Sequence, residues 1–201
     1  HYPLRRQRQM CIRDRIRTAD GTQHLIRLYG VDCLEWHVNN DNDARRLRSQ
    51  RRYFGIAECA ATPQVSIDVA KNLGKAAYLA VQQMLEKPFD VHTAFADGRG
   101  SSKQKRIYAF VTTASGEDLA QSLVRLGLAR AVGVSRVTPQ GKSADEYRAQ
   151  LSDLELQAAK RGVGVWEKTN WDLLVRERES EREEEASLCL LYTSPSPRDR
   201  G

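Results

Sequence analysis

The sequence predicts an α+β fold, a small five-stranded barrel with about three helices. Short runs of alternating apolar residues are typical of strands, and longer segments between them repeat apolar residues at helical spacing. The expected order is strand, strand, helix, strand, strand, helix, strand, helix, with the helices placed between antiparallel hairpins. With 201 residues, of which 40% are hydrophobic, the chain is long enough for one domain with a substantial core.

Five runs have the alternation or the composition of strands. They lie at residues 16–18, 24–29, 89–95, 106–112 and 128–134. Asp20-Gly21 is a turn signal that joins the first two runs into a hairpin. The Gly/Ser-rich residues 98–104 connect the third run to the fourth, in which Tyr108 and Phe110 alternate with smaller apolar residues.

Helical spacing is strong in three segments, and a fourth candidate is short. The segments are residues 68–85, residues 118–126, the stretch that Ser143 opens with a capping-box pattern, and the short candidate at 44–54. Asp41 or Asp43 would cap the short helix, whose basic cluster Arg45–Arg52 either grips a phosphate backbone or faces solvent. Residues 55–66 are expected to be a loop. This order of elements makes an OB-fold barrel the natural candidate, since that barrel has five strands and a face that commonly binds nucleic acid.

Both ends of the chain look foreign to the domain. Residues 10–15 resemble one translated frame of a sequencing adapter, and residues 189–199 resemble the opposite strand of the same adapter. The plainer alternative is a basic tail at one end and a Ser/Pro-rich tail at the other. We expect four parts: a non-native segment at 1–15, the domain at 16–171, a charged tail at 172–188 and a non-native segment at 189–201. The mixed charges of the tail are typical of a solvated helix or a disordered segment.

Composition limits the classes of function. The formal net charge is +6 and the sequence pI is about 9.3, which favours a polyanionic partner, nucleic acid first and an anionic membrane second. No apolar run reaches the length of a membrane span. Cys33 and Cys59 are the two cysteines of the expected domain, and without CxxC spacing they support neither a zinc site nor a disulfide framework. We expect a monomer.

Charged residues gather in one run, residues 25–35, that is otherwise apolar. Arg27, Asp32 and Glu35 all belong to it. Burying an ionised group costs on the order of several kcal/mol unless the group pairs or binds an ion. The run therefore predicts a site at the end of a buried strand. The plainer interpretation is that Arg27 forms an ordinary surface ion pair with one of the two acids.

The same run resembles the signature of the staphylococcal nuclease family, in which an Arg on a strand is followed by an Asp and then a Glu at this spacing. Three further stretches match family motifs in the same order along the chain. They are residues 105–111, which include Arg106, residues 123–130, and residues 158–161 with Val165-Trp166. The resemblance extends from about residue 16 to residue 166.

The resemblance implies calcium-dependent cleavage of phosphodiester bonds. Arg27 and Arg106 would stabilise the negative charge on the phosphate oxygens, and Glu35 would orient or deprotonate the attacking water. Asp32 would bind Ca²⁺, together with the backbone carbonyl of Cys33. The implied enzyme is a nuclease that hydrolyses DNA, with RNA as a further substrate, shows little sequence specificity and leaves 3′-phosphates. Members of the family are often exported, which favours a secreted or periplasmic location.

Several positions depart from the family pattern. The family has a calcium-binding Asp on its first strand, and counting back at the family spacing reaches Arg13, within the adapter-like segment. Leu34 replaces a usual Pro, and Gly133 and Ser135 stand near positions where the type member has tyrosines that stack on the nucleotide. The missing calcium-binding Asp favours an alternative function, a catalytically impaired module that binds nucleic acid. A truncated chimera that folds imperfectly is the third alternative.

Overall fold

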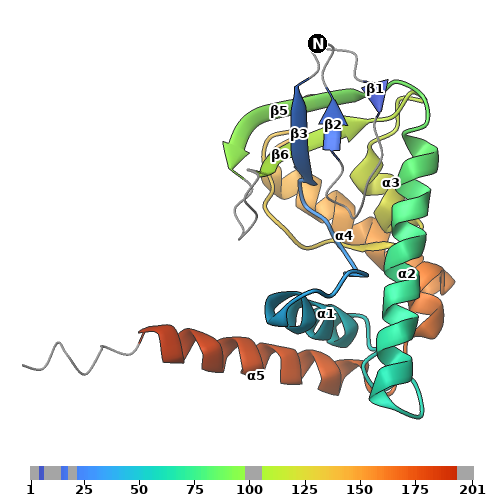
Figure 1. The fold of residues 1–201 in the computed structure, drawn as a ribbon, viewed down its shortest axis with the longest axis vertical. Helices are drawn as coiled ribbons and strands as arrows, with labels where there is room; N and C mark the ends of the chain where they lie inside the picture. The colour runs from blue at the N-terminus through green and yellow to red at the C-terminus, as the bar shows by residue number, and fades with distance from the viewer. Residues whose placement is uncertain (1–4, 7–14, 18–21, 98–105, 194–201) are drawn as a thin grey trace, which may run out of the picture.

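The computed structural model describes residues 5–6, 15–17, 22–97 and 106–193, and it has a mixed α+β structure (Figure 1). Its larger sheet has five strands in the order β1-β2-β3-β6-β5. The strands are β1 (Arg5–Arg6), β2 (Arg15–Arg17), β3 (Gln23–Leu28), β6 (Arg106–Thr112) and β5 (Asp90–Asp97). A second sheet pairs β4 (Asp32–Cys33) with β7 (Ala129–Arg130). The predicted α+β class is confirmed.

Strand pairing follows the prediction at the first hairpin and departs from it in the middle of the sheet. β2 is antiparallel to β3, with Ile16 opposite His24, and β5 is antiparallel to β6. β3 and β6 pair in parallel. The sequence pattern did not predict this pairing, because local alternation does not report which distant strands become neighbours. In the part of the chain described, the assigned ladders form one five-stranded sheet and a separate pair of strands.

The described residues form five α-helices and one 3₁₀-helix, where about three helices were expected. They are α1 (Asp41–Tyr53), α2 (Pro63–Met84), α3 (Leu119–Arg125), α4 (Ala144–Arg161), η1 (Gly164–Lys168) and α5 (Leu174–Thr193). The capping box of Ser143 at the start of α4 is confirmed. The expected cap of α1 is wrong, because the side chain of Asn40 accepts the backbone N–H of Asp43 there. The long helix starts earlier than expected, since Pro63 fits the first turn, where an N–H has no helical partner.

Two apolar clusters hold these elements together, and the charged run lies where they meet. The first cluster packs the large sheet against α2, α3 and α4, and it includes Cys33. The second lies between α1, α2, α4 and η1, and it includes Leu34, Phe54 and Trp166. Consecutive residues of one short segment thus belong to different cores. This anchoring fixes the backbone between Asp32 and Glu35.

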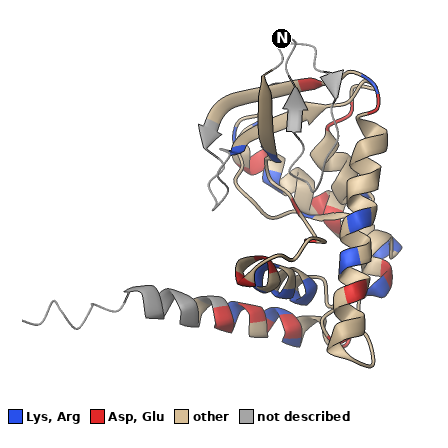
Figure 2. Ribbon diagram, in the orientation of Figure 1, with Lys and Arg blue, Asp and Glu red and all other residues tan. Residues whose placement is uncertain are grey.

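Helix α5 lies alongside α1 (Figure 1), although its sequence has no apolar stripe. Charged residues of both signs line the two helices (Figure 2). Glu177 is 3% exposed, and its carboxylate accepts the backbone N–H groups of Ala57 and Glu58, each at 3.0 Å. Glu184 pairs with Arg52 of α1. The segment expected to be a charged tail is therefore a helix that polar contacts from Glu177 to Glu184 attach to the domain.

Some sequence-based expectations concern residues outside the described ranges. These are Arg13, the turn at Asp20-Gly21, the connection at 98–104, and most of the two adapter-like ends. Within the ranges that are described, no helix is both long enough and apolar enough to cross a membrane.

Candidate functional site

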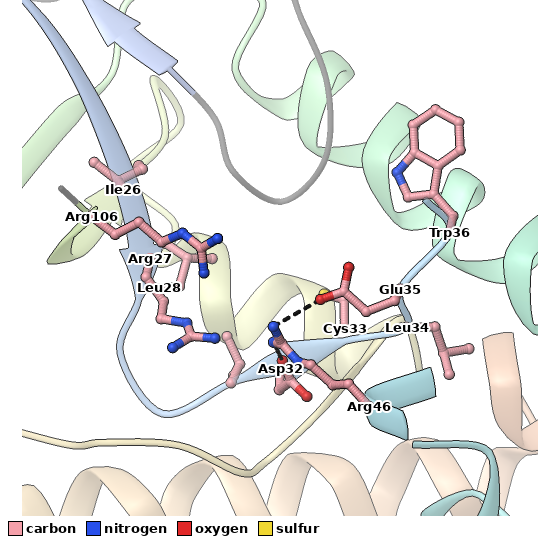
Figure 3. A pocket seen from close by; sticks show the side chains of 11 residues that line it. Ile26, Arg27, Leu28, Asp32, Cys33, Leu34, Glu35, Trp36, Arg46 and Arg106 are labelled. Carbon is pink, nitrogen blue, oxygen red and sulfur yellow. Dashed lines mark hydrogen bonds and ion pairs between the residues drawn. The ribbon is translucent and has the colours of Figure 1, made fainter. Parts of the chain in front are cut away.

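The parallel pairing of β3 with β6 brings two distant arginines to one face of the sheet. In the register of this pair, Leu25 lies opposite Arg106 and Arg27 lies opposite Tyr108. Side chains two residues apart on a strand share a face, so Arg27 and Arg106 point to the same side. Figure 3 shows both guanidinium groups on the side of β3 where Asp32 and Glu35 lie. Arg106 is 8% exposed, which places its charge at the edge of the core.

A tight turn carries the chain from β3 into β4. Gly30 has φ +75°, in the left-handed region that favours glycine, and a Cβ there would lie 2.6 Å from Cδ1 of Leu151. The turn delivers Asp32 to the β4–β7 ladder, where Arg130 is its register partner. Glu35 follows three residues later and is 9% exposed. Backbone geometry therefore places both carboxylates beside the arginine face of the sheet.

Two further arginines enclose Asp32. Arg130 donates to Oδ2 of Asp32 through Nε at 3.1 Å and through Nη2 at 3.0 Å. Arg46, from α1, pairs through Nη2 with Oδ1 of Asp32 and through Nη1 with Oε1 of Glu35 at 2.8 Å. One guanidinium group thus bridges the two carboxylates, as the dashed lines in Figure 3 mark. The side chains of Asp32 and Glu35 are only 16% and 11% exposed, so solvent ions screen these pairs weakly.

Gln50 fixes the same segment through its side-chain amide. It is fully buried, and its Nε2 donates to Oδ2 of Asp32 at 2.9 Å and to the Cys33 carbonyl at 2.7 Å. Its Oε1 accepts the backbone N–H of Glu35 at 2.8 Å. Arg46 and Gln50 are four residues apart and so lie on one face of α1. That helix therefore supplies both the bridging cation and the amide clamp.

The pKa values of the adjacent residues Asp32 and Cys33 shift in opposite directions. Burial alone would raise the pKa of Asp32, but the charges of Arg46 and Arg130, with an amide hydrogen bond, hold it below its ordinary value. Asp32 is therefore ionised at neutral pH. Burial, together with the charges of Asp32 and Glu35, raises the pKa of the Cys33 thiol well above its ordinary value. The Cys33 sulfur is therefore a neutral thiol, and its contribution to the site is its backbone.

The residues that the sequence singled out line one small pocket between the sheet and α1. Its lining includes Arg27, Asp32, Cys33, Glu35 and Arg106, together with Arg46. A neighbouring groove shares Arg27 and Arg46 with the pocket and adds Tyr108 and Gly133. Guanidinium groups are planar forks that bind two phosphate oxygens, and a carboxylate can accept a proton from water. The pocket thus contains groups that can bind an anion and a carboxylate that can act as a base.

Comparison with known proteins identifies the family. A model of staphylococcal nuclease homologues matches residues 25–168, which is most of the chain. The chain belongs to the staphylococcal nuclease family. The nuclease match runs from β3 through η1 and contains every pocket residue named above. A search of curated proteins gives no significant match. The resemblance predicted from the motifs is confirmed, and nuclease membership implies an OB-fold, whose barrel closure stays a prediction.

Three residues around Asp32 have roles that the motifs did not predict, namely Arg46, which lines the pocket, and Gln50 and Arg130, which donate to the Asp32 carboxylate. Arg46 belongs to the basic cluster expected on α1, but it faces the pocket rather than solvent or an outer phosphate. The four-residue spacing from Arg46 to Gln50 was the available signal, and a neutral Gln gives no reason to assign it to a site. Arg130 ends a family motif, and its role depends on the pairing of β4 with β7. None of these contacts is local in sequence.

Nuclease membership implies calcium, and the described donors do not fit that ion. Ca²⁺ takes six to eight oxygen ligands. Among the residues described, no three His, Cys, Asp or Glu side chains gather as a metal site. Both carboxylate oxygens of Asp32 form ion pairs with arginines, and the Cys33 carbonyl accepts a hydrogen bond from Gln50. Guanidinium groups already neutralise the carboxylates that a calcium ion would need.

Proposed function

We propose that the chain is a nuclease that hydrolyses phosphodiester bonds of DNA, with RNA as a further substrate. The proposal includes little sequence specificity and products that carry a 3′-phosphate. The observation that carries it is the meeting of Arg27, Arg106 and Glu35 in one pocket, although they come from two strands and a turn. Membership of the staphylococcal nuclease family supports the same reaction class.

The chemistry follows from these three groups. Arg27 and Arg106 bind the non-bridging oxygens of the scissile phosphate and neutralise the charge that builds up at five-coordinate phosphorus. Glu35 accepts a proton from water as the oxygen–phosphorus bond forms. The bond from phosphorus to the 5′-oxygen breaks, solvent protonates that oxygen, and the phosphate stays on the 3′-side. We assign no step to calcium, because the described donors do not fit it.

Hydrolysis of single-stranded DNA by the full chain tests this proposal, with calcium and with a chelator in parallel. Loss of a general base lowers rates by about 10²–10⁴-fold, and we expect Glu35→Gln to fall within that range. Glu167→Gln is the matched control, because it makes the same change at an exposed position on η1. Equal rates for Glu35→Gln and the control would contradict the assignment. The chelator arm tests the calcium dependence that the family resemblance predicts.

A nucleic-acid-binding module without turnover is the second candidate. The ion pair between Arg46 and Glu35 favours it, because a carboxylate that holds a guanidinium is less available to accept a proton from water. This candidate predicts binding of a labelled oligonucleotide that weakens with salt, and no product. Glu35→Gln would bind as well as the wild type, whereas Arg27→Gln would bind more weakly. Product formation is the readout that separates the two candidates.

A further inference from the structure

The pocket already contains a cation at the position between its two carboxylates. Arg46 contacts Asp32 with one terminal nitrogen and Glu35 with the other, the second at 2.8 Å. A divalent ion that used both carboxylates would need this same space. Arg46 and such an ion are therefore alternatives at one position.

Two further oxygens around that position, Oδ2 of Asp32 and the Cys33 carbonyl, are also in use. Arg130 and Gln50 both donate to Oδ2 of Asp32, at 3.0–3.1 Å and 2.9 Å. The Cys33 carbonyl accepts Gln50 at 2.7 Å. An incoming ion would have to displace a buried amide as well as a guanidinium group, and two positive charges would repel it.

Helix α1 holds Arg46 in this place. The helix is capped by Asn40, and its far side is attached to α5 through Ser49 with Glu181 and through Arg52 with Glu184. The Arg46 side chain is 30% exposed, less than the 54% of Arg48 on the same helix. A side chain that bridges two carboxylates from an anchored helix has little freedom to leave.

We propose that Arg46 is the resident cation of this pocket and excludes a divalent ion from Asp32 and Glu35. The inference rests on the proposed function for the position of the phosphodiester site. Three arginines, Arg27, Arg46 and Arg106, line the pocket against two carboxylates. The pocket is therefore cationic without a metal ion, and a phosphodiester anion binds to it directly.

Terbium binding to the full chain tests the exclusion without any need for turnover. Tb³⁺ binds at calcium sites, and its luminescence is excited through Trp36, which lines the same pocket. Arg46→Gln should bind Tb³⁺ at least roughly tenfold more tightly than the wild type, because one positive charge and its two ion pairs are gone. Arg45→Gln is the matched control, since it removes the same charge from an exposed neighbour that does not line this pocket.

Each outcome decides the inference. Tighter binding by Arg46→Gln alone supports it, and competition by calcium places the ion at the calcium-binding oxygens. Equal binding by the wild type and Arg46→Gln, or binding by neither, overturns it. If Arg46→Gln loses its circular dichroism spectrum, Arg46→Met replaces it, because Met keeps the aliphatic part of the side chain and removes the charge.

The cleavage assay separates this inference from the proposed function. Tighter terbium binding by Arg46→Gln with no DNA cleavage by any variant would contradict the nuclease proposal and support the exclusion. Wild-type cleavage that requires calcium would support the nuclease proposal and overturn the exclusion. Cleavage by the wild type that persists in the chelator would support both.

Discussion

At the scale of single residues, Gln50 contributes stability through three hydrogen bonds in the buried site. Gln50→Leu would leave the Cys33 carbonyl and the Glu35 N–H without this partner. A lost bond costs about 1 kcal/mol, and an unsatisfied buried group about 1–3 kcal/mol, so we expect a total loss of about 3 kcal/mol in urea unfolding. Gln64→Leu is the control, because its single partner is Asp68 on the exposed start of α2. A loss no greater than in Gln64→Leu would show that the hydrogen bonds of Gln50 contribute little to the free energy of unfolding.

Glu155 should make stability depend on pH. Its carboxylate accepts the Tyr53 hydroxyl at 2.8 Å and the Ala131 N–H at 3.1 Å. Burial raises its pKa above the ordinary value despite these bonds and the charges of Arg178 and Arg130. The folded state then binds the proton more tightly than the unfolded state. The stabilisation is complete below the ordinary Glu pKa and is lost as the pH rises through the raised value.

Glu155→Gln tests this contribution, because the amide cannot ionise. The variant loses one acceptor oxygen at every pH, so the diagnostic quantity is the slope of its stability difference from the wild type. Between about pH 4 and pH 7 the free energy of unfolding of the variant should rise relative to that of the wild type. The rise is about 1.4 kcal/mol for each factor of ten by which folding increases the proton affinity of Glu155. Urea unfolding at several pH values measures this slope. A constant difference over that range would contradict the raised pKa.

The sequence predicted the residues of the site better than their partners. Arg27, Asp32 and Glu35 could be found because they share one short apolar run, and Arg106 because it begins a strand with a recognisable motif. Both observations are local. The cation that bridges the carboxylates, Arg46, comes from a helix whose orientation depends on tertiary packing, and so its role could not be read from its neighbours.

At the scale of elements, the junction between α4, η1 and α3 depends on one close approach. Gly162 and Gly164 both have φ +62°. A Cβ on Gly164 would lie 2.4 Å and 2.5 Å from the carbonyl oxygens of Leu126 and Gly127, whereas nothing lies within 4 Å of one on Gly162. Gly162→Ala should cost only the left-handed backbone, about 1 kcal/mol. Gly164→Ala adds a backbone clash and should cost about 3 kcal/mol or more.

Thermal melts of the two glycine variants measure this difference with the backbone conformation held constant. Equal losses would mean that the junction can relax around a methyl group. The close approach at Gly164 matters for the site because Trp166 of η1 and Leu34, the residue next to Glu35, belong to the same apolar cluster.

Element boundaries were predictable where the local signal is strong. β6 occupies the predicted residues, and the capping box of Ser143 begins α4 as expected. The start of α2 was missed because Pro63 reads as a loop residue until its place in a first helical turn is known. Helix α5 packs through charges, as Glu177 shows, and charge patterns resemble those of solvated helices.

At the scale of the whole molecule, the net charge differs between the parts of the chain. Residues 16–171 contain 22 Lys and Arg against 17 Asp and Glu, a net charge of +5, whereas residues 172–188 contain 3 against 7, a net charge of −4. The two ends add a further +5, which gives the formal total of +6. The positive charge that favours a polyanionic partner is therefore present in the expected domain, where Arg27, Arg46 and Arg106 line one pocket with two carboxylates.

This distribution predicts how nucleic-acid binding should respond to salt. Each phosphate neutralised on a single strand contributes about 0.7 to the slope of log affinity against log salt concentration. Arg27→Gln should lower that slope by about 0.7 and weaken binding, because Arg27 lines both the pocket and the neighbouring groove. Arg125→Gln, at an exposed position at the end of α3, removes the same charge outside them and should leave the slope unchanged. Fluorescence anisotropy with a labelled single-stranded oligonucleotide, across a salt series, measures both slopes. Since both variants keep every other basic residue, equal slopes would place the binding outside the arginine pocket.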